Sequence, residues 1–182
     1  LHYHTFKNKD GQLAVTLFPY LLKEYNRRWF LIAAAESDGK LLTFGLDRID
    51  GVENLPSHKY VDYDGDLNEL YEDIIGVTYK GDSPVYKIML WVSDNSKDYV
   101  VTKPLHESQR SVSEAKAQEL YSLFPTLSGG QFFIIECKEN YELIRELTSF
   151  GKDLVVLSPK PITDLVERRV LEMFEIYSKL RT

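Results

Sequence analysis

The stretch PYLLKEYNRRWFLIA, residues 19–33, combines a turn-forming residue with a run that favours a strand. Residues 19–25 lead into Asn26, and residues 27–33 are rich in aromatic and aliphatic side chains, which favour strands. Alternation along this strand places Trp29 and Leu31 on one face and Phe30 on the other. We expect Leu31 and at least one of the aromatic residues to lie in a core. The remaining aromatic residue could line a groove and stack on a base.

Three further β-rich runs surround this stretch. They cover residues 1–6, 13–19 and 41–46. Residues 8–11 and 37–40 separate the runs and have the composition of tight turns. Several short strands with closely spaced turns predict a small β-barrel or a curled sheet.

Residues 51–84 differ in charge from the rest of the chain. They contain two Lys/Arg and eight Asp/Glu residues, whereas residues 1–50 contain seven and six. Asp66 can cap a short helix that runs to about Asp73, and Gly76 can end it. Residues 80–84 have the composition of a linker, so we predict one domain over 1–80, with 51–80 as its acidic connection, and a second over 85–182.

The second domain is predicted to alternate strands with helices. We expect strands over residues 85–92, 131–137 and 153–157, and helices over 94–103, 141–150 and 161–180. Between them we expect strands over 105–110 and 117–123, although a helix over 113–120 competes with the last. The order β-α-β-β-α-β plus a terminal helix resembles a ferredoxin-like layer, which makes the fold class α+β.

The overall composition is that of a soluble globular protein. Hydrophobic residues make up 43% and charged residues 27% of 182 residues, and the net charge is −6, which lacks the basic balance of a dedicated nucleic-acid binder. No apolar run is long enough to cross a membrane. The single cysteine, Cys137, lies in an apolar run and is expected to be a buried thiol, which fits a reducing, cytoplasmic location. The chain opens on a strand without Met, so we expect further residues upstream.

Five short motifs resemble those of one family. Trp29-Phe30-Leu31 is similar to the WYL triad with Phe in place of Tyr, and FGLDRI at 44–49 is similar to the second family motif. KPLHESQ at 103–109, SFG at 149–151 and LSP at 157–159 resemble the C-terminal extension that follows many WYL domains. The resemblance implies a small five-stranded Sm-like, SH3-type β-barrel followed by a ferredoxin-like extension.

The resemblance also implies a function. It indicates the effector-sensing half of a bacterial transcriptional regulator whose upstream helix-turn-helix, absent from this chain, binds duplex DNA. In some members the ligand is thought to be a nucleic acid or nucleotide, so we expect a nucleotide-like or other anionic ligand, including a short single strand. The expected ligand-binding residues are Arg48, Tyr3, Tyr20, Arg28, Trp29 and His106. Many members carry arginines where this chain has Leu42 and Gly45, and the alternative is a protein-interaction module without a small ligand.

Several candidate residues admit a structural role instead. Arg48 could bind a phosphate or carboxylate with two hydrogen bonds, or it could form a structural ion pair. Arg27 and Arg28 alternate in direction, so at most one of them is expected at the ligand site. His2 and His4 share a face, but no Cys or third His lies nearby, so we predict no metal site and no cofactor.

His106 and Ser108 suggest a hydrolase. Against it, the sequence contains no nucleophile elbow and no Gly-rich oxyanion loop. We therefore expect no enzymatic activity.

The terminal helix over residues 161–180 carries an apolar stripe. Part of the stripe must cover the sheet, while Phe174, Tyr177 and Leu180 could reach a partner. Because helix-turn-helix regulators usually read two half-sites, we expect a homodimer held partly by this domain.

Overall fold

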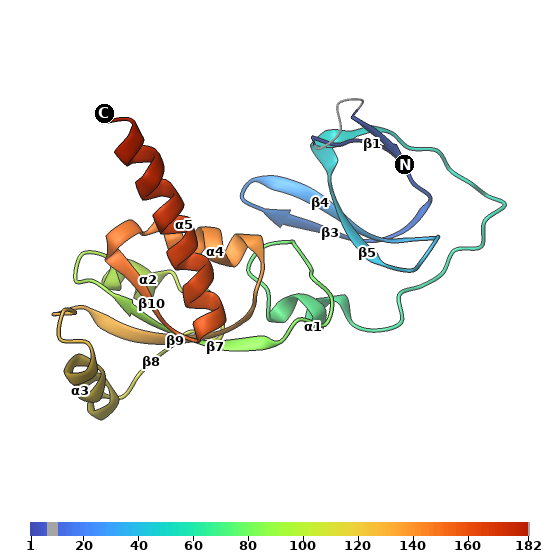
Figure 1. The fold of residues 1–182 in the computed structure, drawn as a ribbon. Coiled ribbons are helices and arrows are strands. Elements are labelled where there is room, and N and C mark those ends of the chain that lie inside the picture. Colours follow the sequence, from blue (N-terminus) through green and yellow to red (C-terminus); the bar gives the residue numbers. More distant parts are fainter. Residues whose placement is uncertain (7–10, 182) are drawn as a thin grey trace. The chain divides into compact units, whose positions relative to one another are not determined.

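The computed structural model describes residues 1–6 and 11–181, and these divide into two compact units (Figure 1). The N-terminal unit comprises Leu1–Glu72 and Gly76–Tyr79, and the C-terminal unit comprises Asp73–Ile75 and Lys80–Thr182. Both consist of antiparallel sheets, and helices are concentrated in the second. The predicted turn over 8–11 lies, except for Gly11, outside the described residues.

Two three-stranded sheets make up the N-terminal unit. One has the order β2-β1-β6 and the other β3-β4-β5. The strands are β1 (His2–His4), β2 (Gln12–Ala14), β3 (Leu17–Tyr25), β4 (Arg28–Ala35), β5 (Leu41–Gly45) and β6 (Ile49–Gly51), with the 3-10 turn η1 (Leu46–Arg48) before β6 and helix α1 (Leu67–Glu72) after it.

The described strands do not join into one closed barrel, which corrects the predicted SH3-type barrel. The strand predicted over residues 13–19 is interrupted at Val15 and Thr16. Its first part pairs in one sheet and its second part in the other. The chain thus changes sheets where an unbroken strand was expected.

A tight hairpin joins β3 to β4. Tyr25 pairs with Arg28, and the two residues between them, Asn26 and Arg27, have φ angles of 49° and 62°. Positive φ at both central positions is the geometry of a type I′ turn, whose twist matches that of the flanking strands. Residues 19–25 are therefore part of a strand and not a lead-in, and Pro19 is tolerated because β3 lies at a sheet edge.

The core of the N-terminal unit is small and partly aromatic. Tyr3, Ala33 and Phe44 are buried, with Leu31 and Ile49 packed against them. The Tyr3 and Phe44 rings meet edge to face, with centroids 5.0 Å apart. Leu31 therefore belongs to the core as predicted, whereas Trp29 is 52% exposed.

The C-terminal unit is a four-stranded antiparallel sheet of order β10-β7-β9-β8 with helices on both faces. Its elements are β7 (Val85–Val92), α2 (Lys97–Thr102), β8 (Arg110–Ser111), α3 (Glu114–Leu123), β9 (Gln131–Lys138), α4 (Tyr141–Ser149), η2 (Gly151–Asp153), β10 (Leu154–Ser158) and α5 (Lys160–Lys179). Ile88 and Leu90 point to the face that α4 and α5 cover, and Trp91 points to the face that α3 covers. This division follows from strand alternation.

The segment between β7 and β9 differs from the prediction. Residues 117–123 form a helix, because Ala117, Leu120 and Tyr121 recur at helical spacing and all pack beside Phe132. Ser113 caps this helix by accepting a hydrogen bond from the Lys116 amide. Of the strand predicted over 105–110, only Arg110 is in a strand.

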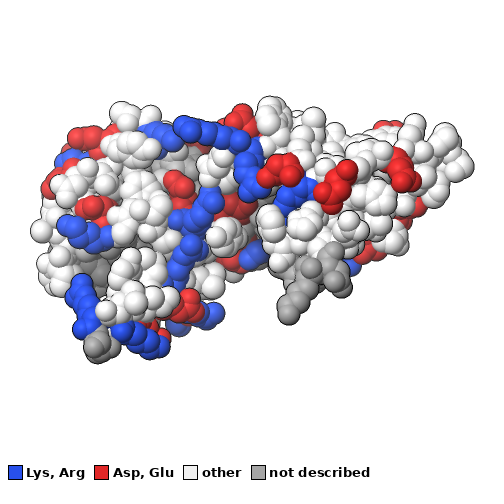
Figure 2. Space-filling view, turned by 90° about the horizontal axis from the view of Figure 1, so that it is seen from above, with Lys and Arg blue, Asp and Glu red and all other residues white. Residues whose placement is uncertain are grey.

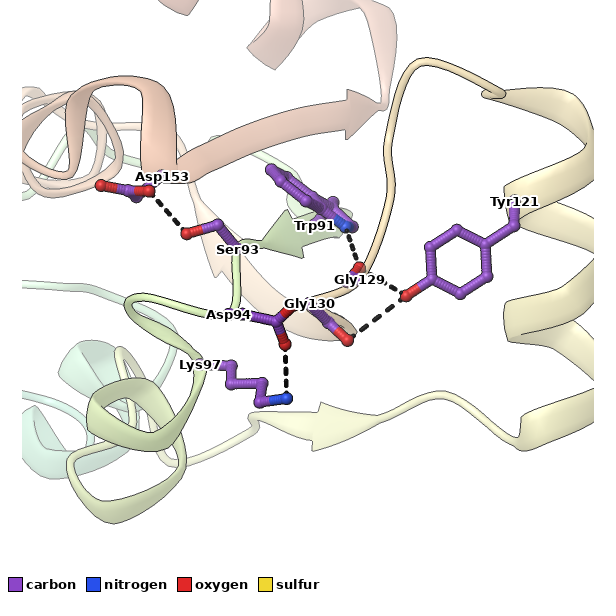
Figure 3. A network of polar contacts seen from close by, with 8 residues as sticks. All are labelled: Trp91, Ser93, Asp94, Lys97, Tyr121, Gly129, Gly130 and Asp153. Carbon is purple, nitrogen blue, oxygen red and sulfur yellow. Dashed lines mark hydrogen bonds and ion pairs between the residues drawn. The ribbon is translucent and has the colours of Figure 1, made fainter.

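A polar network at the end of β7 fixes the loop before β9 (Figure 3). Trp91 Nε1 and the Tyr121 hydroxyl both donate to the carbonyl oxygen of Gly129, at 3.0 and 2.7 Å. Asp94 accepts from Lys97 at 2.5 Å, and this hydrogen bond, followed by one from the Gly130 amide, holds the pKa of Asp94 below its usual value. Asp94 therefore anchors the loop and does not cap α2, whose N-cap is Ser96.

Surface charge is mixed. On the face shown in Figure 2, Lys and Arg side chains lie among Asp and Glu side chains, with wide uncharged areas between them. Among the described residues, no helix is long and apolar enough to cross a membrane, and no group of three or more His, Cys, Asp or Glu side chains is placed to hold a metal ion.

Candidate anion-binding site

Arg48 is held between two aromatic rings of the N-terminal unit. It ends the 3-10 turn η1, and its guanidinium carbon lies 4.7 Å from the centroid of the Tyr3 ring and 4.7 Å from that of Phe6. Stacking on two ring faces orients the planar cation and leaves its edge for hydrogen bonds. Within residues 1–6 and 11–181, Arg48 Nε is buried without a hydrogen-bond acceptor, and Arg48 forms no ion pair.

The neighbouring carboxylate of Asp47 is paired with Arg28. An Arg28 terminal nitrogen donates to Asp47 Oδ2, and both side chains are about half exposed. This hydrogen bond from Arg28, with a smaller contribution from the charge of Arg48, lowers the pKa of Asp47. Because Asp47 is bound to Arg28, it does not neutralise Arg48 by direct contact. Arg28 and Arg48 thus place two cations beside one carboxylate at the end of β5.

Gly45 allows this corner to be compact. Its amide donates to the Tyr3 hydroxyl at 3.1 Å, which anchors the ring on which Arg48 stacks. A Cβ atom at Gly45 would lie 2.9 Å from Asp47 Oδ1 and 3.6 Å from Arg48 Nε. A side chain at position 45 would therefore require the Asp47 carboxylate to shift, while its Cβ would only contact Arg48.

The remaining predicted ligand residues lie apart from this corner. The Tyr20 hydroxyl donates to the Val61 carbonyl at 3.0 Å. Burial raises the pKa of Tyr20, and Tyr60, Asp62 and Tyr63 raise it further, which indicates surroundings unsuited to an anion. Trp29 pairs with Glu24 across the β3–β4 hairpin.

His106 belongs to the C-terminal unit. Its Nδ1 lies 2.7 Å from Ser108 Oγ. That hydroxyl also accepts from the Glu136 amide and donates toward the Glu136 carbonyl, at 2.7 and 3.2 Å. Ser108 is therefore engaged by the backbone of β9.

Sequence reasoning missed two features of the N-terminal unit. Phe6, which supplies the second ring at Arg48, carries no local signal for this role because its partner is 42 positions away. The other is a pocket of about 520 Å³, lined mainly by apolar side chains that include Leu17, Leu31, Leu46, Ile49, Val52 and Leu55. Its lining residues come from four separate segments, so no single sequence motif predicts the pocket.

Comparison with family models gives one match for each half of the chain. A WYL domain covers residues 1–54, which includes Tyr3, Phe6, Arg28, Asp47 and Arg48, and a WCX domain covers residues 84–174. The chain belongs to the family of WYL proteins that carry a WCX domain. The resemblance of the Trp29-Phe30-Leu31 and FGLDRI motifs to WYL domains is thereby confirmed.

Two solved structures resemble this WYL–WCX chain. A crystal structure of a CRISPR Cas-related protein has a TM-score of 0.50 and 14% sequence identity, and the match covers 98% of this chain and 47% of that one. Proteasome accessory factor B/C (PafBC) of Arthrobacter aurescens has a TM-score of 0.38 and 16% identity, and the match covers 93% and 24%. The chain thus spans less than half the length of either. Comparison with curated proteins finds no match.

Proposed function

We propose that this WYL–WCX chain is the effector-sensing part of a cytoplasmic transcriptional regulator, and that it binds an anionic, nucleotide-like ligand at Arg48. The observation that carries the proposal is the state of the Arg48 side chain, which is stacked, oriented and without an ion pair among the described residues. A buried guanidinium nitrogen without an acceptor is costly, so an incoming phosphate or carboxylate oxygen would relieve that cost.

Aromatic surface beside Arg48 favours a ligand that contains a base. Phe6 is 75% exposed although one face of its ring meets Arg48. The exposed part of this ring can stack on a base while Arg48 binds the phosphate, the combination by which proteins bind single strands without sequence preference. Phe6 belongs to the matched WYL domain.

The DNA-binding part of the regulator is inferred from the family and not from the residues of this chain. We propose that duplex DNA is bound by an upstream helix-turn-helix and that this chain performs no catalysis. The strand order β10-β7-β9-β8, with α2 and α4 as crossovers, supports a ferredoxin-like WCX domain to which α3 is added. We likewise propose an open, Sm-like arrangement for the two N-terminal sheets.

A thermal-shift screen tests the ligand proposal. Nucleoside mono-, di- and triphosphates and short single strands are added to the wild type and to Arg48→Ala. We expect at least one of these anions to raise the melting temperature of the wild type and to have a much smaller effect on the variant, because a ligand that binds only the native state stabilises it. Indifference of both proteins to every anion would contradict the proposal.

The second half of α5 supports the proposal that the regulator is a homodimer. This half and the C-cap residue that follows it expose seven large apolar side chains, each at least 49% accessible: Val170, Leu171, Met173, Phe174, Ile176, Tyr177 and Leu180. Figure 1 shows this part of the helix extending beyond α4 and the sheet of its own unit. An apolar patch of this kind marks an interaction surface.

The charged side chains of α5 leave the apolar patch free to pair. Arg168, Glu172 and Glu175 line one face of the helix, and at 3.6 residues per turn this face lies opposite Phe174 and Tyr177. A second copy of the chain would therefore cover the apolar face and leave the charged face in water. We expect Phe174→Glu to convert a dimer to a monomer in sedimentation velocity, and Leu123→Glu, at an equally exposed position on α3, to leave it dimeric.

A further inference from the structure

The apolar pocket of the N-terminal unit is a second candidate ligand site. Its volume of about 520 Å³ falls within the range of small-molecule pockets, and its lining is mainly hydrophobic. Three of the lining side chains are exposed although they are large and apolar: Val52 at 74%, Leu55 at 40% and Leu46 at 37%. Filling the pocket would remove this apolar area from water.

One wall of the pocket is formed by residues 52–60, which contain neither helix nor strand. Side-chain contacts at the surface attach this wall to the sheets: His2 Nε2 lies 3.1 Å from Glu53 Oε1, His58 Nδ1 lies 2.7 Å from Glu36 Oε1, and the Tyr60 hydroxyl donates to the Pro19 carbonyl at 2.8 Å. No strand of the described sheets includes this wall.

The charges around the pocket select the class of ligand. Among the described residues, neither Lys nor Arg lines it, and Glu53 is its carboxylate. A second carboxylate, that of Glu36, contacts the lining residue His58. A phosphate or carboxylate placed here would meet no Lys or Arg, whereas an ammonium group would share the Glu53 carboxylate with His2. The pocket is thus the chemical opposite of the Arg48 site.

We propose that this pocket binds an apolar amine, a molecule with a hydrocarbon or aromatic body and one protonated nitrogen. The body would contact Leu17, Leu46 and Leu55, and the nitrogen would lie at the rim beside Glu53. The proposal does not rest on the anion site at Arg48, although Leu46 and Ile49, which line the pocket, flank Asp47 and Arg48 in the sequence.

Fluorescence of the neutral apolar probe N-phenyl-1-naphthylamine measures occupancy of the pocket. We expect saturable binding of one probe per chain. Leu55→Asp and Val52→Gln introduce polarity into the lining and should weaken probe binding by about tenfold or more, a loss of about 1.4 kcal/mol. The control Val61→Asp changes an exposed residue of the same segment outside the lining and should bind as the wild type does.

Displacement of the probe tests the amine. Dodecylamine should displace it at a concentration about tenfold lower than dodecanoate does, and Glu53→Gln should abolish that difference while the probe still binds. Absence of saturable probe binding by the folded wild type would overturn the proposal. So would equal displacement by the two compounds, or equal probe binding by Leu55→Asp, Val52→Gln and Val61→Asp. Circular dichroism confirms that each variant is folded.

Discussion

Replacement of Asn140 by Ala should strongly destabilise the C-terminal unit. Asn140 is 1% exposed and immediately precedes α4. Its side-chain oxygen accepts from the Leu143 amide at 2.8 Å, and its side-chain nitrogen donates to the Ile75 carbonyl at 2.9 Å. One side chain thus caps α4 and connects it to residues 73–75. These three residues belong to the C-terminal unit, although residues 76–79, which follow them, belong to the N-terminal unit.

The cost of Asn140→Ala follows from these two hydrogen bonds. Loss of an N-cap costs about 1 kcal/mol, and leaving the buried Ile75 carbonyl without its donor adds about 1–3 kcal/mol. The free energy of unfolding should therefore fall by roughly 2–4 kcal/mol. For a unit of this size that corresponds to a decrease in melting temperature of roughly 10–30 °C. Asn140→Ser retains a cap acceptor, adds no buried charge and loses the hydrogen bond to the Ile75 carbonyl, so it should be destabilised less than Asn140→Ala.

Urea unfolding followed by tryptophan fluorescence measures this change selectively. The chain has two tryptophans, of which Trp91 lies in the C-terminal unit at 8% exposure and Trp29 in the N-terminal unit at 52%. In a Trp29→Phe background the emission reports the C-terminal unit alone. A free energy of unfolding of Asn140→Ala within about 0.5 kcal/mol of that of the parent, or equal destabilisation by Asn140→Ser, would refute the assigned roles of the two hydrogen bonds.

Three further outcomes are expected. Arg28→Ala should raise the pKa of Asp47 toward its usual value in an NMR titration. The pKa of Asp47 is lower in the folded than in the unfolded protein. The stabilisation from this pair is therefore present above the unfolded pKa of 3.8 and disappears as the pH falls through the folded pKa. Burial raises the pKa of Cys137 to about 12. A thiol reagent at pH 8 should therefore label Cys137 only in denaturant. The contribution of the protonated thiol to the free energy of unfolding should decline as the pH rises above the ordinary thiol pKa of 9.0. Gly130→Ala should cost roughly 2–4 kcal/mol in a urea melt, because a Cβ there meets backbone at φ +72°, whereas Gly81→Ala, at φ +68° in open space, should cost only about 1 kcal/mol; equal losses would contradict the steric argument.

Local periodicity was enough to predict most of the C-terminal unit. In α4 the apolar residues recur every three or four positions, and Ile144 and Leu147 are buried where that pattern places them. Gly151 adopts a φ of 58° directly after the helix, as expected of a C-terminal stop. The strand predicted over residues 117–123 is wrong because their short apolar pattern fits a strand or a helix equally well. Contacts with Trp91 and Phe132 favour the helix.

The N-terminal unit depends more on contacts that are distant in sequence. The change of sheet at Val15 and Thr16 reflects a choice of strand partner, which alternation within one strand does not specify. The motif identifies Arg48, but its stacking against Tyr3 and Phe6 brings together segments far apart in the sequence. The pocket beneath residues 52–60 is formed in the same way, and its lining segments share no periodic signal.

The most direct test of an anion site at Arg48 is the affinity for a labelled single strand. Fluorescence anisotropy with a short fluorescein-labelled oligothymidylate, at one fixed salt concentration, compares the wild type with Arg48→Ala and with Arg27→Ala, which removes the same charge from the exposed β3–β4 turn. We predict that Arg48→Ala weakens binding by about tenfold or more, as expected for loss of a charge-assisted contact, while Arg27→Ala stays within about twofold. Equal affinities of the two variants would contradict the central claim.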